Sequence, residues 1–126
     1  MIPPAQTDFD DWVLSTYAQA GSFTMLFILV GIGETKVHLL RSAYVHVVGD
    51  ELRWPDMRTL FKSANVDWSG AAFFRAGREG LVEDAEAKAR LASLVRKLDE
   101  DRSLIREGEF FNSDGLRLAI EEIKPH

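Results

Sequence analysis

The chain has 126 residues, no cysteine and a formal net charge of −5 at pH 7. This length suits one domain with a core that needs no metal or disulfide, and the lack of cysteine excludes disulfides, thiolate metal sites and cysteine nucleophiles. Excess acidic charge argues against nucleic-acid binding, which needs a basic surface. We therefore expect a cytoplasmic protein that binds neither nucleic acid nor membranes.

The N-terminal part of the chain predicts an arm followed by a helix. Residues 1–6 contain two prolines and are expected to form a disordered arm ahead of a single domain over residues 7–126. Thr7 with Asp10 three residues later is a relative of the capping box that begins helices, and Gly21 is a suitable end for this helix.

The apolar run from Phe23 to Ile32 predicts a central strand buried on both faces. It is too short to span a membrane, and the residues ahead of it are acidic rather than basic as in a signal peptide. Gly31 and Gly33 lack the third glycine of a nucleotide-binding turn. The next segment, residues 33–43, fits either a strand or a helix, and we favour the strand.

Residues 44–54 predict a β-hairpin. Gly49 and Asp50 form a two-residue turn of the type that starts with glycine, and the residues on either side alternate in polarity. In this register His46 faces Arg53 on the exposed side of the hairpin.

A short helix is predicted to follow from Pro55 to Asn65. Its buried stripe is expected to consist of Met57, Leu60, Phe61 and Ala64. Residues 66–76 then predict a third buried strand, and the small residues 70–72 suggest that another element packs closely there.

The long amphipathic segment Asp84–Glu107 predicts the main helix, with Asp84 as its cap and Gly108 as its left-handed end. Residues 109–123 are expected to form a closing hairpin around a turn at residues 112–115. The apolar stripe of the long helix is expected to lie on the sheet and comprises Ala87, Leu91, Leu94, Val95, Leu98 and Ile105.

These elements together predict an α+β domain. We expect a mainly antiparallel sheet of about five strands, the long helix packed across one face, and the two shorter helices at its edges.

The sequence offers little that is typical of catalysis or metal binding. His38 and His46 are eight residues apart, which fits no helical pair of metal ligands. No serine lies in a nucleophile elbow, and the carboxylates of Asp50 and Glu51 are expected at a solvated turn. We therefore expect no cofactor and favour a non-enzymatic protein.

Two phenylalanine doublets are the strongest functional signal. Phe73-Phe74 and Phe110-Phe111 each lie in a predicted strand, where consecutive side chains point to opposite faces. If helices cover one face only, the outer rings form an apolar patch suited to a second copy of the chain or another protein. The opposing interpretation is that the N-terminal helix covers the second face, or that one doublet ends its strand.

Two hypotheses for function follow. The first is a protein-binding module that forms a homodimer through this aromatic face. The second is a small-molecule site, or a small enzyme, in the cleft between the long helix and the sheet. The polar side chains proposed for that cleft are those of His38, His46, Arg53 and Arg75.

Overall fold

A computed structural model describes residues 7–33, 37–77 and 80–118. The predicted arm, residues 1–6, lies outside these ranges. In chain order the elements are α1 (Asp8–Ala20), β1 (Phe23–Ile32), β2 (Val37–Val47), α2 (Trp54–Lys62), β3 (Gly70–Arg75), α3 (Asp84–Glu100), the 3-10 helix η1 (Arg102–Glu107) and β4 (Glu109–Asn112).

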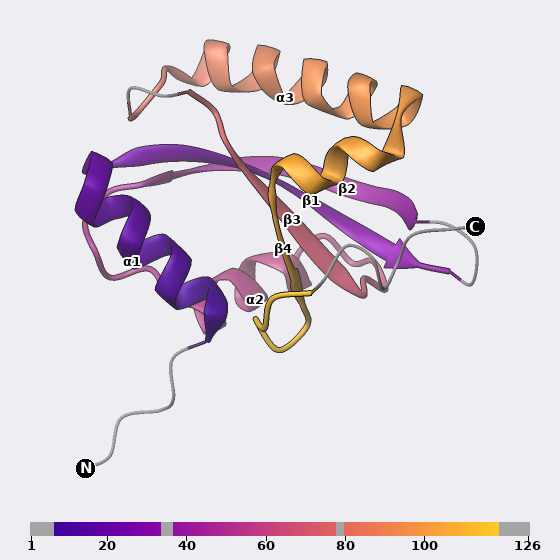
Figure 1. Cartoon of the computed structure of the whole chain (residues 1–126), viewed down its shortest axis with the longest axis horizontal. Helices are drawn as coiled ribbons and strands as arrows, with labels where there is room; N and C mark the ends of the chain where they lie inside the picture. The colour runs from indigo at the N-terminus through magenta and orange to yellow at the C-terminus, as the bar shows by residue number, and fades with distance from the viewer. Residues whose placement is uncertain (1–6, 34–36, 78–79, 119–126) are drawn as a thin grey trace.

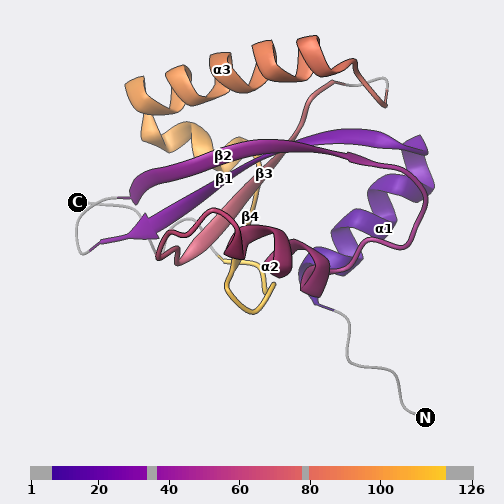
Figure 2. The same ribbon diagram turned by 180° about the vertical axis from the view of Figure 1, so that it is seen from behind.

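The four described strands form one antiparallel sheet in the order β2-β1-β3-β4. The predicted α+β class is therefore confirmed, with four strands among the described residues where about five were expected. Figure 1 shows three layers: α3 and η1 cover one face of the sheet, and α1 and α2 cover the other. The reverse view in Figure 2 shows the same arrangement, so the two short helices lie on a face rather than at the sheet edges.

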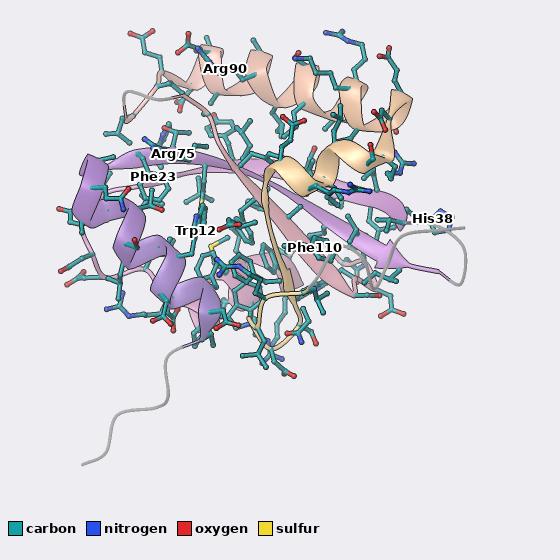
Figure 3. The ribbon with its side chains drawn as sticks, in the orientation of Figure 1. Trp12, Phe23, His38, Arg75, Arg90 and Phe110 are labelled. Atoms are coloured by element: carbon teal, nitrogen blue, oxygen red, sulfur yellow. The ribbon has the colours of Figure 1, made fainter. Side chains whose placement is uncertain are left out.

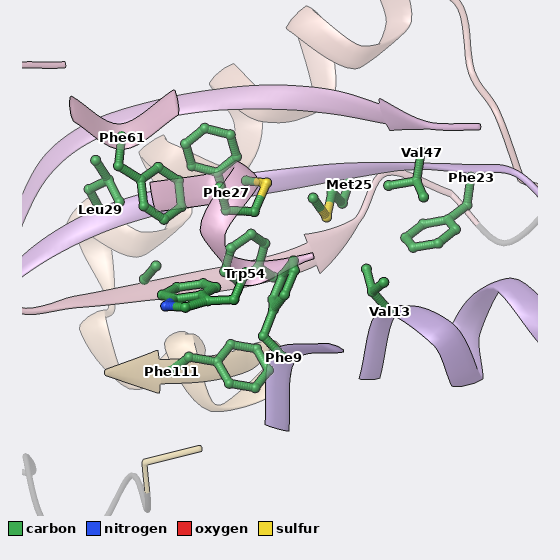
Figure 4. Close-up of a cluster of buried hydrophobic side chains, with 13 residues drawn as sticks. Phe9, Val13, Phe23, Met25, Phe27, Leu29, Val47, Trp54, Phe61 and Phe111 are labelled. Carbon is green, nitrogen blue, oxygen red and sulfur yellow. The ribbon is translucent and has the colours of Figure 1, made fainter. Parts of the chain in front are cut away.

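The position of β1 explains these layers. Eight of its ten residues are buried, and their side chains alternate between the two faces. Phe23, Met25, Phe27 and Leu29 pack with α1 and α2 in an aromatic-rich core (Figure 4). Ile28 and Val30 pack against α3, η1 and β4 in a second core. Both faces of the sheet therefore need a helical cover.

The first helix begins as predicted. Thr7 and Asp10 form a capping box, in which each side chain accepts a hydrogen bond from the main-chain N–H of the other residue. The buried Asp10 carboxylate also accepts a hydrogen bond from the main-chain N–H of Trp54 at 2.7 Å. One carboxylate thus fixes the start of α1 against the start of α2.

The predicted hairpin over residues 44–54 is wrong. Residues 37–47 instead form β2, which pairs with β1, and Trp54 begins α2 with its ring in the core. Alternating polarity marks a strand but does not identify its partner, and the ten-residue β1 ladder offers more hydrogen bonds than the short segment 51–54. The strand favoured for residues 33–43 is confirmed from Val37 onwards.

The long helix is shorter than predicted. α3 ends at Glu100 and the chain continues as η1, and Gly108 has a φ of −105°, so it is not a left-handed end. The Arg102 guanidinium explains the break, because it donates to the carbonyl oxygen of Leu98 at 2.6 Å and of Val37 at 2.9 Å. It thereby caps α3 and ties it to β2.

Several local predictions have mixed outcomes. The closing hairpin is confirmed as far as Leu118, whose N–H donates to the Phe110 carbonyl oxygen at 2.9 Å; residues 119–123 lie outside the described ranges. Glu83 rather than Asp84 precedes the first turn of α3. Leu60, predicted to be buried, is 42% exposed, because the side of α2 that carries Met57 and Phe61 faces the core. No helix within the described ranges is long and apolar enough to cross a membrane.

We expect Leu98→Ala to lower the free energy of unfolding by about 2–5 kcal/mol, because the side chain is fully buried between α3 and the sheet. Leu94→Ala should cost less, since Leu94 is half-buried at the edge of this core. Urea unfolding measures both values. Equal losses at the two positions would contradict this orientation of α3.

The turn after β2 gives a second prediction. Gly49 has a φ of +83° with no atom within 4 Å of the position that a Cβ would take. Gly49→Val should therefore destabilise the protein by about 1–2 kcal/mol or more through backbone strain alone. Asp50→Asn is the matched control and should be nearly silent in the same thermal unfolding measurement. A silent Gly49→Val would contradict the left-handed conformation.

Candidate functional site

A cleft lies between the end of β3, the segment that follows it, and the first half of α3. It has a volume of about 700 Å³ and is open to solvent. The end of β3 contributes Arg75, and α3 contributes Glu86 and Arg90 to its wall. The remaining wall is formed by small and aliphatic residues, namely Ala76, Gly77, Leu81 and Val82.

A second hollow of about 290 Å³ adjoins the first and shares Arg75, Ala76 and Arg90 with it. It extends along α3 to Lys97, over a floor that includes Leu26 and Phe74. The two hollows together form what we call the α3 cleft. Its α3 wall carries the cationic side chains of Arg90 and Lys97 and the carboxylate of Glu86, although the chain as a whole is acidic.

The cationic residues of the cleft come from two elements. Arg90 and Lys97 are seven residues apart, so they lie on the same flank of α3. Arg90 forms an ion pair with Glu86 at 3.4 Å, with both side chains about half exposed. Arg75 ends β3 at the edge of the cleft, but its guanidinium carbon lies 5.8 Å from the ring centre of Phe23, which belongs to the core on the α1 side of the sheet. Figure 3 shows Arg75 and Phe23 near one end of the sheet, below the start of α3.

A hydrogen-bond chain fixes the start of α3 beside this cleft. The imidazole of His46 contacts the hydroxyl of Thr24 through Nδ1 at 2.8 Å and the carboxylate of Asp84 through Nε2 at 2.7 Å. The N–H of Val82 donates to the same Thr24 hydroxyl at 3.0 Å. An ionised carboxylate only accepts, so Nε2 of His46 donates in the contact with Asp84.

The charges in this chain shift two pKa values. The hydrogen bond from His46, helped by Tyr44 and Lys88, holds the pKa of the Asp84 carboxyl below its ordinary value of 3.8. Partial burial, together with the negative charge of Asp84, raises the pKa of the Tyr44 phenol above its ordinary value of 10.0. The cluster therefore favours ionised Asp84 beside a neutral phenol.

Thr24, His46 and Asp84 contact one another in the order hydroxyl, imidazole, carboxylate, as the nucleophile, base and acid of a catalytic triad do. However, the Thr24 hydroxyl is not accessible to a substrate. Thr24 is fully buried, and its oxygen already accepts the Val82 N–H. A substrate has no access to this hydroxyl in the present conformation. The chain is better explained as the anchor that holds the cleft wall and the start of α3 on the sheet.

The four polar residues predicted for the cleft lie apart. Arg75 lines it, and His46 lies beside it in the hydrogen-bond chain. His38 is exposed near the start of β2, far from Arg75 in Figure 3. Arg53 precedes α2, where its guanidinium donates to the carbonyl oxygens of Asp50 and Leu52. The prediction that His46 and Arg53 are cross-strand neighbours in a hairpin is therefore wrong.

The phenylalanine doublets each place one ring on either face of the sheet, as predicted. Phe73 and Phe111 belong to the core below α1 and α2, and Phe110 belongs to the core below α3, with Phe74 packed against it. The exposed fractions of Phe73, Phe110 and Phe111 are 0%, 2% and 0%. Because α1 covers the second face, these rings form no exposed aromatic patch, and the self-association expected from them loses its physical basis.

Sequence reasoning missed Arg90 and Lys97 as cleft residues. Charged residues outside the apolar stripe of a helix usually lie on its solvated face, so neither was named as a candidate. A positional signal existed: residues 90 and 97 lie one behind the other on the helix, directly beside the apolar stripe. The signal lacked direction, since only the tertiary fold shows that this flank of α3 faces β3.

The fold and the site define a small α+β domain with a cationic cleft between a helix and an antiparallel sheet. No group of three or more potential metal ligands is present within the described ranges. No protein-family model, curated protein or solved structure matches the chain. The cleft must therefore be interpreted from its own chemistry.

The pairing of His46 with Asp84 predicts a specific loss of stability in acid. The folded-state pKa of Asp84 lies below its unfolded value near 3.8, so this contribution is present above that pH and is lost as the pH falls through the folded pKa. Native protein should be more stable than Asp84→Asn at pH 6, and the difference should shrink towards pH 2.5. Urea unfolding at a series of pH values measures this.

Glu83→Gln is the matched control, because it removes the neighbouring carboxylate without touching the hydrogen bond between His46 and Asp84. Its difference from native protein should change less over the same pH range. A constant difference between native protein and Asp84→Asn would contradict the shifted pKa of Asp84.

Proposed function

We propose that this protein binds a small anionic ligand, with carboxylate or phosphate groups, in the α3 cleft. The observation that carries the proposal is the position of Arg90 and Lys97 on one flank of α3, along one cleft, in a chain with net charge −5. Arginine and lysine are the side chains that pair with such groups, and arginine does so through a planar fork.

The apolar part of the wall supports a small organic anion over a bare ion. Leu81 and Val82 line the larger hollow, and Leu26, Phe74 and Leu94 line the smaller one. Ligand sites in proteins combine such apolar walls with a few charged groups that fix the orientation of the ligand. The volume of about 700 Å³ in the larger hollow also lies within the usual range for such sites.

Binding is a better conclusion than catalysis for this cleft. The hydroxyl of Thr24, which has a histidine beside it, is buried behind the wall. Glu86 forms an ion pair with Arg90. Its carboxylate can accept a hydrogen bond from a bound ligand, or an anionic ligand can take its place beside Arg90. A ligand carboxylate that replaces Glu86 would keep the Arg90 guanidinium paired, so exchange costs little.

The test compares native protein with Arg90→Gln and Lys97→Gln, using inorganic phosphate, citrate and adenosine monophosphate as probes. Binding to the native state alone raises stability by RT ln(1 + [L]/Kd), about 1.4 kcal/mol at ten times Kd. We expect at least one probe to raise the melting temperature of native protein and to lose most of this effect in both variants. Differential scanning fluorimetry measures the shifts, and calorimetry gives the Kd.

The matched control is Arg96→Gln. Arg96 is an exposed cation on the same helix, but it lines a groove on the opposite flank of α3. It changes net charge by the same amount, so it controls for general stabilisation by salts. Equal responses of all three variants, or no response of native protein to any probe, would contradict the proposed site.

A further inference from the structure

The outer edge of the sheet, along β2, carries main-chain groups that point away from the protein. The N–H of Ala76 donates to the carbonyl oxygen of Thr24 at 2.9 Å, so the main-chain groups of Thr24 face β3. His46 lies opposite Thr24, and its own main-chain groups therefore face away from β1. By alternation along the strand, the same holds for Tyr44 and Ser42.

The remainder of this edge is protected. Near the start of β2, the Arg102 guanidinium donates a hydrogen bond to the carbonyl oxygen of Val37. Further along, the Arg41 side chain donates to the carbonyl oxygen of Leu40 at 2.9 Å, and the strand register shifts between Leu39 and Arg41. Arginines and bulges of this kind are how native proteins prevent pairing at sheet edges. Within the described ranges, the segment 42–46 has no such protection.

Hollows flank the open segment on both faces of the sheet. On the α3 side, a groove of about 480 Å³ runs beside Ser42 and is lined by Leu91 and Val95. On the α2 side, a hollow of about 140 Å³ is lined by Ala43 and Leu60. An added β-strand directs alternate side chains to the two faces, so it is the type of element that fills both hollows while it pairs with the edge.

We propose that this edge pairs antiparallel with β2 of a second copy of the chain, around a two-fold axis at Tyr44. Ser42 then pairs with His46 of the partner subunit, and Tyr44 pairs with Tyr44 of the partner subunit. The main-chain groups of Ser42, Tyr44 and His46 thus pair with the same three residues of the other copy, which is the condition for a two-fold interface. The result is one continuous sheet that joins the four described strands of each copy.

The apolar residues beside the axis favour a second copy as the occupant. Ala43 and Val45 are half-buried on the α2 side of β2. The proposed pairing places Ala43 of each copy directly opposite Val45 of the other copy. A stable dimer needs about 1,200 Å² or more of buried surface, which a five-residue strand pair alone does not supply. Leu60, Leu91 and Val95 beside the edge provide further apolar surface to be covered. This edge lies on the opposite flank of α3 from the cleft, so the inference does not depend on anion binding.

The first test is light scattering after size-exclusion chromatography over a series of protein concentrations. Native protein should be dimeric. Tyr44→Pro removes an N–H that points outward and leaves the ladder with β1 intact, so it should give a folded monomer. Tyr44→Ala removes the same side chain but keeps the N–H, and it should remain dimeric. Circular dichroism confirms that each variant is folded.

The second test uses the absence of cysteine in the chain. In Tyr44→Cys the two thiols flank the axis, at the Cα separation of about 5.5 Å that suits both a hydrogen-bonded strand pair and a disulfide. Mild oxidation should cross-link this variant far more than a control variant, because the two thiols are already held side by side. Thr59→Cys, an exposed site on α2, is the control and should stay largely monomeric. Native protein that is monomeric at the highest concentration, or equal cross-linking of the two cysteine variants, would overturn the proposal.

Discussion

The structure depends on the burial of β1 on both faces. A strand with eight buried residues out of ten has no solvated side, so the sheet cannot be covered by one helical layer alone. The neighbouring strand β3 shares this two-sided burial, which is why Phe73 and Phe74 both find cover on opposite faces. The helices α1 and α2 are thus as necessary as α3. The same constraint removes the exposed aromatic face on which a dimer was first expected.

Thr24 is the polar exception in this buried strand, and its hydroxyl determines how the cleft is built. A buried hydroxyl without partners would cost about 1–3 kcal/mol, so it must be satisfied locally. His46 comes from the paired strand β2, and Val82 comes from the segment before α3. Through His46 the contact extends to Asp84 at the first residue of α3. One hydroxyl in the sheet thereby positions both the wall of the cleft and the helix that carries Arg90 and Lys97.

Local signals in the sequence were reliable where the physics is local. The capping box at Thr7, the left-handed Gly49 and the buried run of β1 each depend on neighbouring residues alone, and each was predicted. The partner of β2 and the break after α3 depend on distant residues. Arg102 interrupts the predicted helix because it reaches the Val37 carbonyl oxygen, a contact across 65 positions in the chain. For the same reason the cationic flank of α3 could be read from the spacing, but the strand that it faces could not.

The geometry of α3 keeps the cleft and the open sheet edge apart. Successive residues turn by about 100° around a helix. Relative to the buried Ala87 and Leu98, the cleft residues Arg90 and Lys97 therefore fall on one flank, and Val95 and Asp99 fall on the other. The buried stripe lies between the two flanks and holds α3 on the sheet. A ligand beside β3 and a strand beside β2 consequently contact opposite sides of one helix, so each can bind without displacing the other.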